Sequence, residues 1–208
     1  MSLRTLDLPT PDALRGRWAA FAAICAARGW SDSCHADDGV WHFDDGGGNC
    51  ADLHHVGDGR AVLIGHDHEY SETYFAEAAA YFGELETDLL AGAPDWWAPP
   101  ARAACGRGNW VGFVYGFDGA TWWRAPYEVE DGFTSVGLVA LDDERLREQA
   151  AEFVQDAPGL TAPPDPAAVG ALVAADGAVT PALVRAVIGL HGWDAEAAAA
   201  AARRFRPS

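Results

Sequence analysis

Short runs of alternating residues between glycine-rich turns constrain the fold of this chain more strongly than any other feature. The runs are Val40–Asp44, Cys50–Val56 and Arg60–Gly65. Asp45-Gly46-Gly47-Gly48 separates the first two runs and Asp58-Gly59 separates the last two. Turns of this composition join neighbouring antiparallel strands. The pattern therefore predicts a three-stranded antiparallel β-meander.

Helical patterns flank this meander. Thr10-Pro11-Asp12 has the features of a helix start, and apolar residues then recur at helical spacing until Gly29. Further helices are predicted over residues 72–83, 142–154, 167–174, 181–190 and 195–205. We therefore expect an α+β fold, with an antiparallel β-meander sheet flanked by helices and a small C-terminal helical appendage.

The domain organisation follows from a change in composition near the C-terminus. Residues 156–166, DAPGLTAPPDP, form a proline-rich linker. The main α+β domain is expected over residues 1–155. The C-terminal helical segment, residues 167–208, is too short to bury a core of its own, so we expect it to dock on the main domain.

A second β segment is rich in aromatic residues. It begins at Trp110, turns at Asp118-Gly119 and returns through Trp122-Trp123, and one more strand is expected over Phe133–Leu141. Prolines frame a loop that contains Trp96-Trp97. These aromatic residues are either core side chains or, if they are exposed, a partner-binding or sugar-stacking surface. The candidate partner-binding residues are Trp96, Trp97, Trp122, Trp123 and Arg124.

The formal net charge of −17 limits the possible partners. Nucleic acids and anionic membranes require a basic surface, so neither is an expected partner. The acidity suits a basic protein partner, although it could also serve solubility alone. The first residues lack the apolar core of a signal peptide, no stretch is apolar enough to span a bilayer, and the four cysteines are irregularly spaced. We therefore expect a cytoplasmic protein with reduced cysteines.

Six of the seven histidines fall between residues 35 and 68. A two-residue turn at Asp58-Gly59 would place Ala51 opposite His66 and Asn49 opposite His68. A four-residue turn after Asp44 would place His42 opposite Ala51. One face of the sheet would then gather the candidate metal ligands His42, Asp44, His66 and His68.

Such a set of imidazoles and a carboxylate suits zinc or another divalent transition metal. A metal-bound water could act as a nucleophile there, with Glu69 or Glu72 as general base. A zinc knot is an alternative arrangement, with the ligands Cys34, His35, Cys50 and His54. The interpretation depends on the register, since a slip of one residue moves the side chains to the opposite face. No cofactor is firmly predicted.

Residues 43–70, FDDGGGNCADLHHVGDGRAVLIGHDHEY, resemble the central hairpin of the SUKH superfamily. The similar features are the Gly46-Gly47-Gly48-Asn49 turn, the alternating Ala51-Asp52-Leu53 strand and the strand end at His66-Asp67-His68. A strand followed by an acidic helix, near residues 135–154, is also similar. The resemblance implies an α+β fold and a non-catalytic bacterial immunity protein that binds and neutralises a toxin.

Two functional hypotheses follow. The first is an acidic protein-interaction module of immunity type that captures a basic toxin domain through electrostatic steering. The second is a metal-dependent hydrolase, with zinc or manganese, built on the histidine and aspartate residues of the meander. The first is favoured because the chain contains none of the short catalytic or nucleotide-binding motifs.

Overall fold

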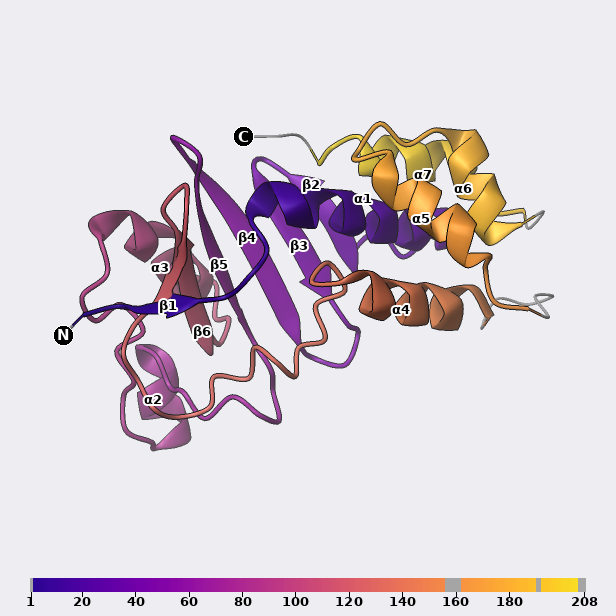
Figure 1. Ribbon diagram of the computed structural model, residues 1–208. Coiled ribbons are helices and arrows are strands. Elements are labelled where there is room, and N and C mark those ends of the chain that lie inside the picture. Colours follow the sequence, from indigo (N-terminus) through magenta and orange to yellow (C-terminus); the bar gives the residue numbers. More distant parts are fainter. Residues whose placement is uncertain (1, 156–161, 190–191, 206–208) are drawn as a thin grey trace. The chain divides into compact units, whose positions relative to one another are not determined.

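The computed structural model describes residues 2–155, 162–189 and 192–205, and it shows an α+β protein (Figure 1). The described residues form seven β-strands and seven α-helices, and every described strand pairing is antiparallel. The predicted fold class, including the C-terminal helices, is therefore confirmed. The chain divides into two compact units: Met1–Thr10 with Asp44–Gly137 is the first unit, and Pro11–Phe43 with Leu138–Pro207 is the second unit.

The first unit is built on an antiparallel arrangement of strands in the order β1-β7-β6-β5-β4. These strands are β1 (Arg4–Leu6), β7 (Trp122–Arg124), β6 (Phe113–Phe117), β5 (Arg60–His66) and β4 (Cys50–Gly57). Every residue of β6 is buried, as the apolar residues on both of its faces predict. The strand β6 is therefore the centre of this unit.

One face of these strands is covered by η1 (Asp95–Trp97) and α3 (Ala98–Gly106). The sequence predicted a loop here because of its prolines, and that prediction is wrong. Two of the prolines occupy the first turn of α3, where a missing N–H group costs no hydrogen bond. The indole of Trp97 then lies directly on Gly116, at a position where a Cβ atom would overlap with the ring.

The helix α2 (Glu77–Phe82) is shorter than the predicted helix over residues 72–83. The residues before it are held in a non-helical conformation by bonds to other segments. The hydroxyl of Thr73 donates to the carbonyl of Gly112, and Ala76 has a positive φ of 52°. The helix can begin only after this anchored segment.

The second unit contains α1 (Pro11–Arg28) and a hairpin of β2 (Cys34–Asp37) and β3 (Val40–Asp44). The predicted first helix is thus confirmed. The hairpin turn Asp38-Gly39 has positive φ at both residues, as a two-residue turn between antiparallel strands requires. The indole of Trp18 packs edge-on against Trp41, with ring centroids 5.8 Å apart. The helix α1 therefore covers one face of the hairpin.

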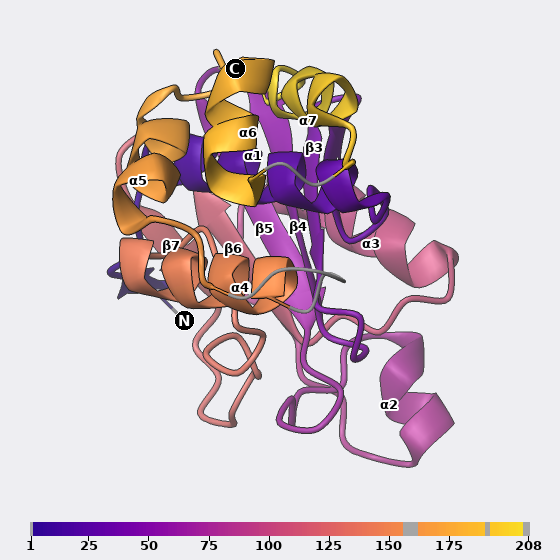
Figure 2. The ribbon, with the colours of Figure 1, turned by 90° about the vertical axis from the view of Figure 1, so that its right-hand side faces the viewer.

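The remaining helices of the second unit pack on α1 (Figure 2). They are α4 (Asp143–Gln155), α5 (Pro166–Ala174), α6 (Pro181–Ile188) and α7 (Ala195–Ala202). Figures 1 and 2 show α4 on the side of α1 away from α6 and α7. Arg15 contributes to this packing through an ion pair with Asp176 at 2.5 Å. All five helices thus belong to one compact unit.

The C-terminal half differs from the sequence-based expectation. The predicted strand over Phe133–Leu141 is wrong, because residues 132–141 form turns, with positive φ at Gly132 and Gly137. In the predicted linker over residues 156–166, residues 156–161 lie outside the described residues. The two compact units also divide the chain at other positions than the predicted boundary at residue 155.

No helix within the described ranges is both long and apolar enough to cross a membrane.

Candidate functional site

The register of β4 and β5 differs from the predicted one. Gly57 lies opposite Arg60, as the two-residue turn predicts, but His55 then lies opposite Ala61 and Cys50 opposite His66. A β-bulge between His55 and Gly57 inserts one residue into β4. The predicted pairing of Ala51 with His66 is therefore wrong by one residue.

This shift separates the residues that the sequence grouped on one face. Because side chains alternate along a strand, Leu53 now shares a face with Leu63, whereas His66 shares the other face with Cys50. The Sγ atom of Cys50 lies 3.5 Å from Nδ1 of His66. Burial lowers the pKa of His66 below its ordinary value and raises that of Cys50 to about 12. Both side chains are therefore neutral at pH 7.

The other predicted metal ligands have local structural contacts. His42, in the second unit, lies opposite His35 in the hairpin, with the two ring centroids 4.8 Å apart. Asp44 accepts a hydrogen bond from the backbone N–H of Gly46 at 2.6 Å. His68 is exposed, and its backbone N–H donates to the side-chain oxygen of Asn49 at 2.9 Å. These contacts shape the turns at the strand ends.

Within the described part of the chain, no three His, Cys, Asp or Glu side chains form a group that could hold a metal ion. This holds both for the predicted ligand set and for the alternative zinc knot of Cys34, His35, Cys50 and His54. Cys34 is fully buried, and its thiol lies 3.7 Å from the carbonyl oxygen of Trp18. The proposed bases Glu69 and Glu72 are exposed.

The candidate partner-binding residues divide into two groups. Trp97 and Trp122 are each 1% exposed and are core side chains. Trp96 and Trp123 are partly exposed. Arg124 places its guanidinium 4.4 Å from the ring centroid of Tyr127 and donates to its carbonyl, so this cation is used within the fold. Only Trp96 and Trp123 are therefore accessible tryptophans of the predicted set.

Three exposed apolar side chains of the first unit lie on and just after α2, and a fourth, Tyr70, is 59% exposed and precedes the helix. Tyr81 is 83% exposed, Phe82 is 48% exposed and Leu85 is 89% exposed. Exposed apolar groups that cluster in this way are a common mark of a binding surface. The sequence predicts only a helix over residues 72–83 and does not indicate that these side chains are exposed, so this surface is absent from the predicted sites.

A ladder of stacked rings fixes the base of this surface. The ring of Trp110 stacks on Tyr74, with centroids 5.8 Å apart and planes 7° from parallel, and it also stacks on His66 at 5.4 Å. Phe82 contacts both Trp110 and Tyr74, at 5.2 and 5.6 Å. The indole N–H of Trp110 donates to the carbonyl of Thr73 at 3.0 Å. These contacts hold α2 against the end of the strands.

A cavity of about 380 Å³ lies beside these rings, and we call it the aromatic pocket. Its lining residues belong to α2 and the residue stretch before it, to the last turn of α3 and to the segment after α3, namely Phe75, Glu77, Ala78, Tyr81, Phe82, Cys105, Gly108, Asn109 and Trp110. The walls are mainly apolar, with one carboxylate, from Glu77, at the rim. Such a cavity can accept the side chain of a partner.

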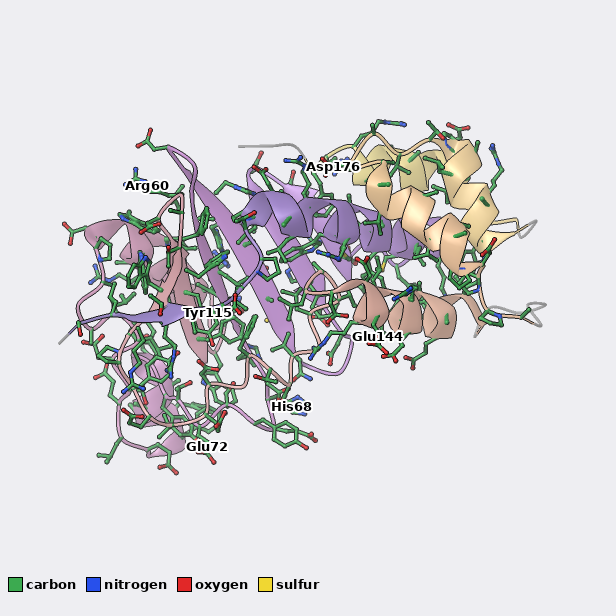
Figure 3. The ribbon with its side chains drawn as sticks, in the orientation of Figure 1. Arg60, His68, Glu72, Tyr115, Glu144 and Asp176 are labelled. Carbon is green, nitrogen blue, oxygen red and sulfur yellow. The ribbon has the colours of Figure 1, made fainter. Side chains whose placement is uncertain are left out.

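The chain segment that contains α2 carries charged side chains of one sign. Residues 67–88 contain seven acidic residues and no arginine, and the chain has no lysine. Glu84, Glu86 and Asp88 are exposed beside Leu85. Figure 3 shows His68 and Glu72 at this end of the first unit, whereas Arg60 lies at the opposite end. The α2 surface, defined as Glu77, Tyr81, Phe82, Glu84, Leu85, Glu86 and Asp88, is thus apolar and anionic.

Comparisons with protein-family models, with curated proteins and with solved structures find no match for this chain.

Proposed function

We propose that this protein is an acidic protein-interaction module that binds a basic partner through the α2 surface. The observation that carries this proposal is the exposure of Tyr81, Phe82 and Leu85 beside an apolar cavity. Tyrosine and other aromatic side chains are enriched at the centres of protein interfaces, where they supply most of the binding energy. A surface of this kind is costly to leave in water without a partner.

The charge of the surface supports a basic partner. The first unit contains 17 of the 31 acidic residues but only five of the 14 arginines. Complementary charge increases the rate of encounter and selects against partners of the same sign. An arginine or lysine side chain would place its aliphatic stem on the rings of the aromatic pocket and its charge near Glu77.

A finer form of the proposal is an immunity-type function, in which the basic partner is a toxin domain. Its support is the resemblance of residues 43–70 to the SUKH superfamily, together with the acidity of the α2 surface. A bacterial, cytoplasmic setting belongs to the same proposal. It is in keeping with the absence of disulfides among the four cysteines, all of which are free.

The experiment is a calorimetric titration of the protein with a hexa-arginine peptide, and with a hexaglutamate peptide as the control ligand. We expect binding of hexa-arginine that weakens as salt is raised, and no binding of hexaglutamate. The triple variant Glu84→Gln, Glu86→Gln, Asp88→Asn should bind hexa-arginine about tenfold more weakly, since three charge contacts of about 0.5 kcal/mol each are lost.

The matched control removes three exposed charges from the second unit, through Glu144→Gln, Glu148→Gln and Glu152→Gln in α4. Its net charge equals that of the first variant, so a binding loss due to overall charge alone would be the same in both. We expect the α4 variant to change affinity less than twofold. Equal losses in the two variants, or binding of hexaglutamate, would contradict the proposal.

A further inference from the structure

A second hollow in the first unit has tryptophan walls. Its volume is about 330 Å³, and we call it the tryptophan pocket. It is lined by Ser2, Leu3, Pro94, Trp96, Trp97, Asp118 and Trp123. It shares no lining residue with the aromatic pocket, so its function is independent of the one proposed for the α2 surface.

The hydrogen bonds of Asp118 hold one wall of this pocket in place. One carboxylate oxygen accepts from the indole N–H of Trp123 at 2.8 Å. The other accepts from the backbone N–H groups of Ala120 and Thr121, at 2.9 and 2.8 Å, and closes the turn between β6 and β7. The ring of Trp123 is therefore set in one orientation by the turn itself.

Trp96 and Trp97 are held by contacts of their own. The rings of Trp96 and Trp97 meet edge to face, with centroids 5.8 Å apart and planes at 66°. Trp97 is buried, and its ring rests on Gly116 of β6. Two tryptophans that belong to η1 and one that belongs to β7 thus form a preorganised aromatic hollow, which reduces the entropy lost when a ligand binds.

The chemistry of the walls favours a cation. The lining residues include one carboxylate, from Asp118, and no arginine or histidine. Hydrogen bonds from the N–H groups of Thr121 and Trp123 lower the pKa of Asp118, so it is ionised at neutral pH. The guanidinium of Arg60 lies over the ring of Trp96, 5.4 Å from its centroid, which is a distance typical of a cation–π contact.

We propose that the tryptophan pocket binds the positively charged head of an alkylammonium ligand, with Trp96 and Trp123 as its accessible aromatic walls, the buried Trp97 as the support of Trp96, and Asp118 as its counter-charge. Tryptophan rings attract cations more strongly than other aromatic rings, and quaternary ammonium groups are recognised in this way. A quaternary ammonium group is compact, so it can contact more than one ring at once, and its methyl groups need no hydrogen-bond partners.

The test compares choline with 3,3-dimethylbutan-1-ol, in which carbon replaces the charged nitrogen without a change of shape. Each is titrated into the full-length protein and followed by the indole N–H signals in NMR spectra. We expect choline to saturate at millimolar concentration and to bind at least fivefold more tightly than the neutral alcohol. Equal affinity for the two compounds, or no choline binding up to about 50 mM, would overturn the proposal.

Variants locate the site. Trp123→Leu and Asp118→Asn should each weaken choline binding at least fivefold. The Asp118→Asn variant is expected to fold, because the side-chain oxygen of asparagine can still accept the hydrogen bonds of the turn. The control is Trp30→Leu, because Trp30 is a tryptophan of the second unit that is 45% exposed and carries Arg28 at 3.7 Å from its centroid. If Trp123→Leu does not fold, the choline affinity of the Asp118→Asn variant alone decides the test. Unchanged affinity in the variant that folds, or tighter binding of a methyl glucoside than of choline, would refute the assignment.

Discussion

Asp131 is expected to be a main determinant of stability in the first unit, and the substitution Asp131→Ala tests this. One carboxylate oxygen of Asp131 accepts hydrogen bonds from the hydroxyls of Tyr115 and Tyr127, at 2.6 and 2.7 Å. Both tyrosines are buried, and burial, together with the charge of Asp131, raises their pKa values. The hydroxyls therefore stay protonated and remain donors over the whole physiological pH range.

The cost of the substitution follows from these contacts. Each buried hydroxyl that loses its acceptor costs about 1–3 kcal/mol, so the two together give a loss of about 2–6 kcal/mol in the free energy of unfolding. This is a large fraction of the 5–15 kcal/mol that is typical of a folded protein. The backbone carbonyl of Asp131 also accepts from Ser71 at 2.8 Å, at the start of the segment that leads to α2. Loss of the carboxylate is thus expected to loosen that segment.

The assay is urea unfolding, followed by tryptophan fluorescence and by circular dichroism. A triple variant, Asp131→Ala with Tyr115→Phe and Tyr127→Phe, serves as the comparison, because it removes the donors together with the acceptor. We expect it to be more stable than Asp131→Ala alone, since it leaves no tyrosine hydroxyl without an acceptor. The backbone N–H of Phe133, which donates to the other carboxylate oxygen of Asp131 at 3.1 Å, loses its acceptor equally in both variants. A loss below about 1 kcal/mol in the single variant, or no recovery in the triple variant, would refute this reasoning.

Three further predictions follow from burial and packing. Gly116→Ala should lower the free energy of unfolding in urea by about 1–3 kcal/mol, because the added Cβ would overlap the buried indole of Trp97. Gly106→Ala is the control and should not destabilise the fold, because the space at its Cβ is open. A bulky maleimide on Cys105, which lines the aromatic pocket, should abolish hexa-arginine binding, and retained affinity would contradict the assigned surface. Burial lowers the pKa of His54 and His66 below 6.5, so the unfolded state takes up protons first. Stability should therefore fall as the pH drops below about 6.5, and should fall less when both are glutamine.

The helices were largely predictable from the sequence because their ends are marked. Pro11, Pro166 and Pro181 each stand at the start of a helix, and Thr180 caps α6 through its hydroxyl. Local signals of this kind depend only on neighbouring residues. The helix α3 was missed because a run of two prolines beside two tryptophans was read as a loop, although the same prolines fit the first turn of a helix.

The strands of the meander were predicted by position but not by register, whereas β1 and β2 were not predicted. The turn at Asp58-Gly59 was correct, yet the bulge at His55 moved every later pair of β4 and β5 by one residue. No residue type marks this bulge in the sequence. The Asp38-Gly39 turn, by contrast, carried a recognisable hairpin signal, and β2 could have been predicted from it.

The candidate site could not be predicted from the sequence because exposure is a property of the whole fold. Tyr74 and Phe82 occur at a spacing that suits a buried helix face, and only the structure shows α2 starting after the anchored segment and leaving Tyr81 in water. Likewise Trp97 and Trp123 look equivalent in the sequence, but one is buried on Gly116 and the other is held at the surface by Asp118.

Chemical-shift mapping tests the central proposal most directly. The ¹⁵N-labelled protein is titrated with hexa-arginine while the backbone amides and indole N–H groups are followed. We expect saturable shifts confined to residues 70–88 and to the indole of Trp110. Shifts spread evenly over both units, or centred on α4, would contradict the proposal that the α2 surface is the binding surface.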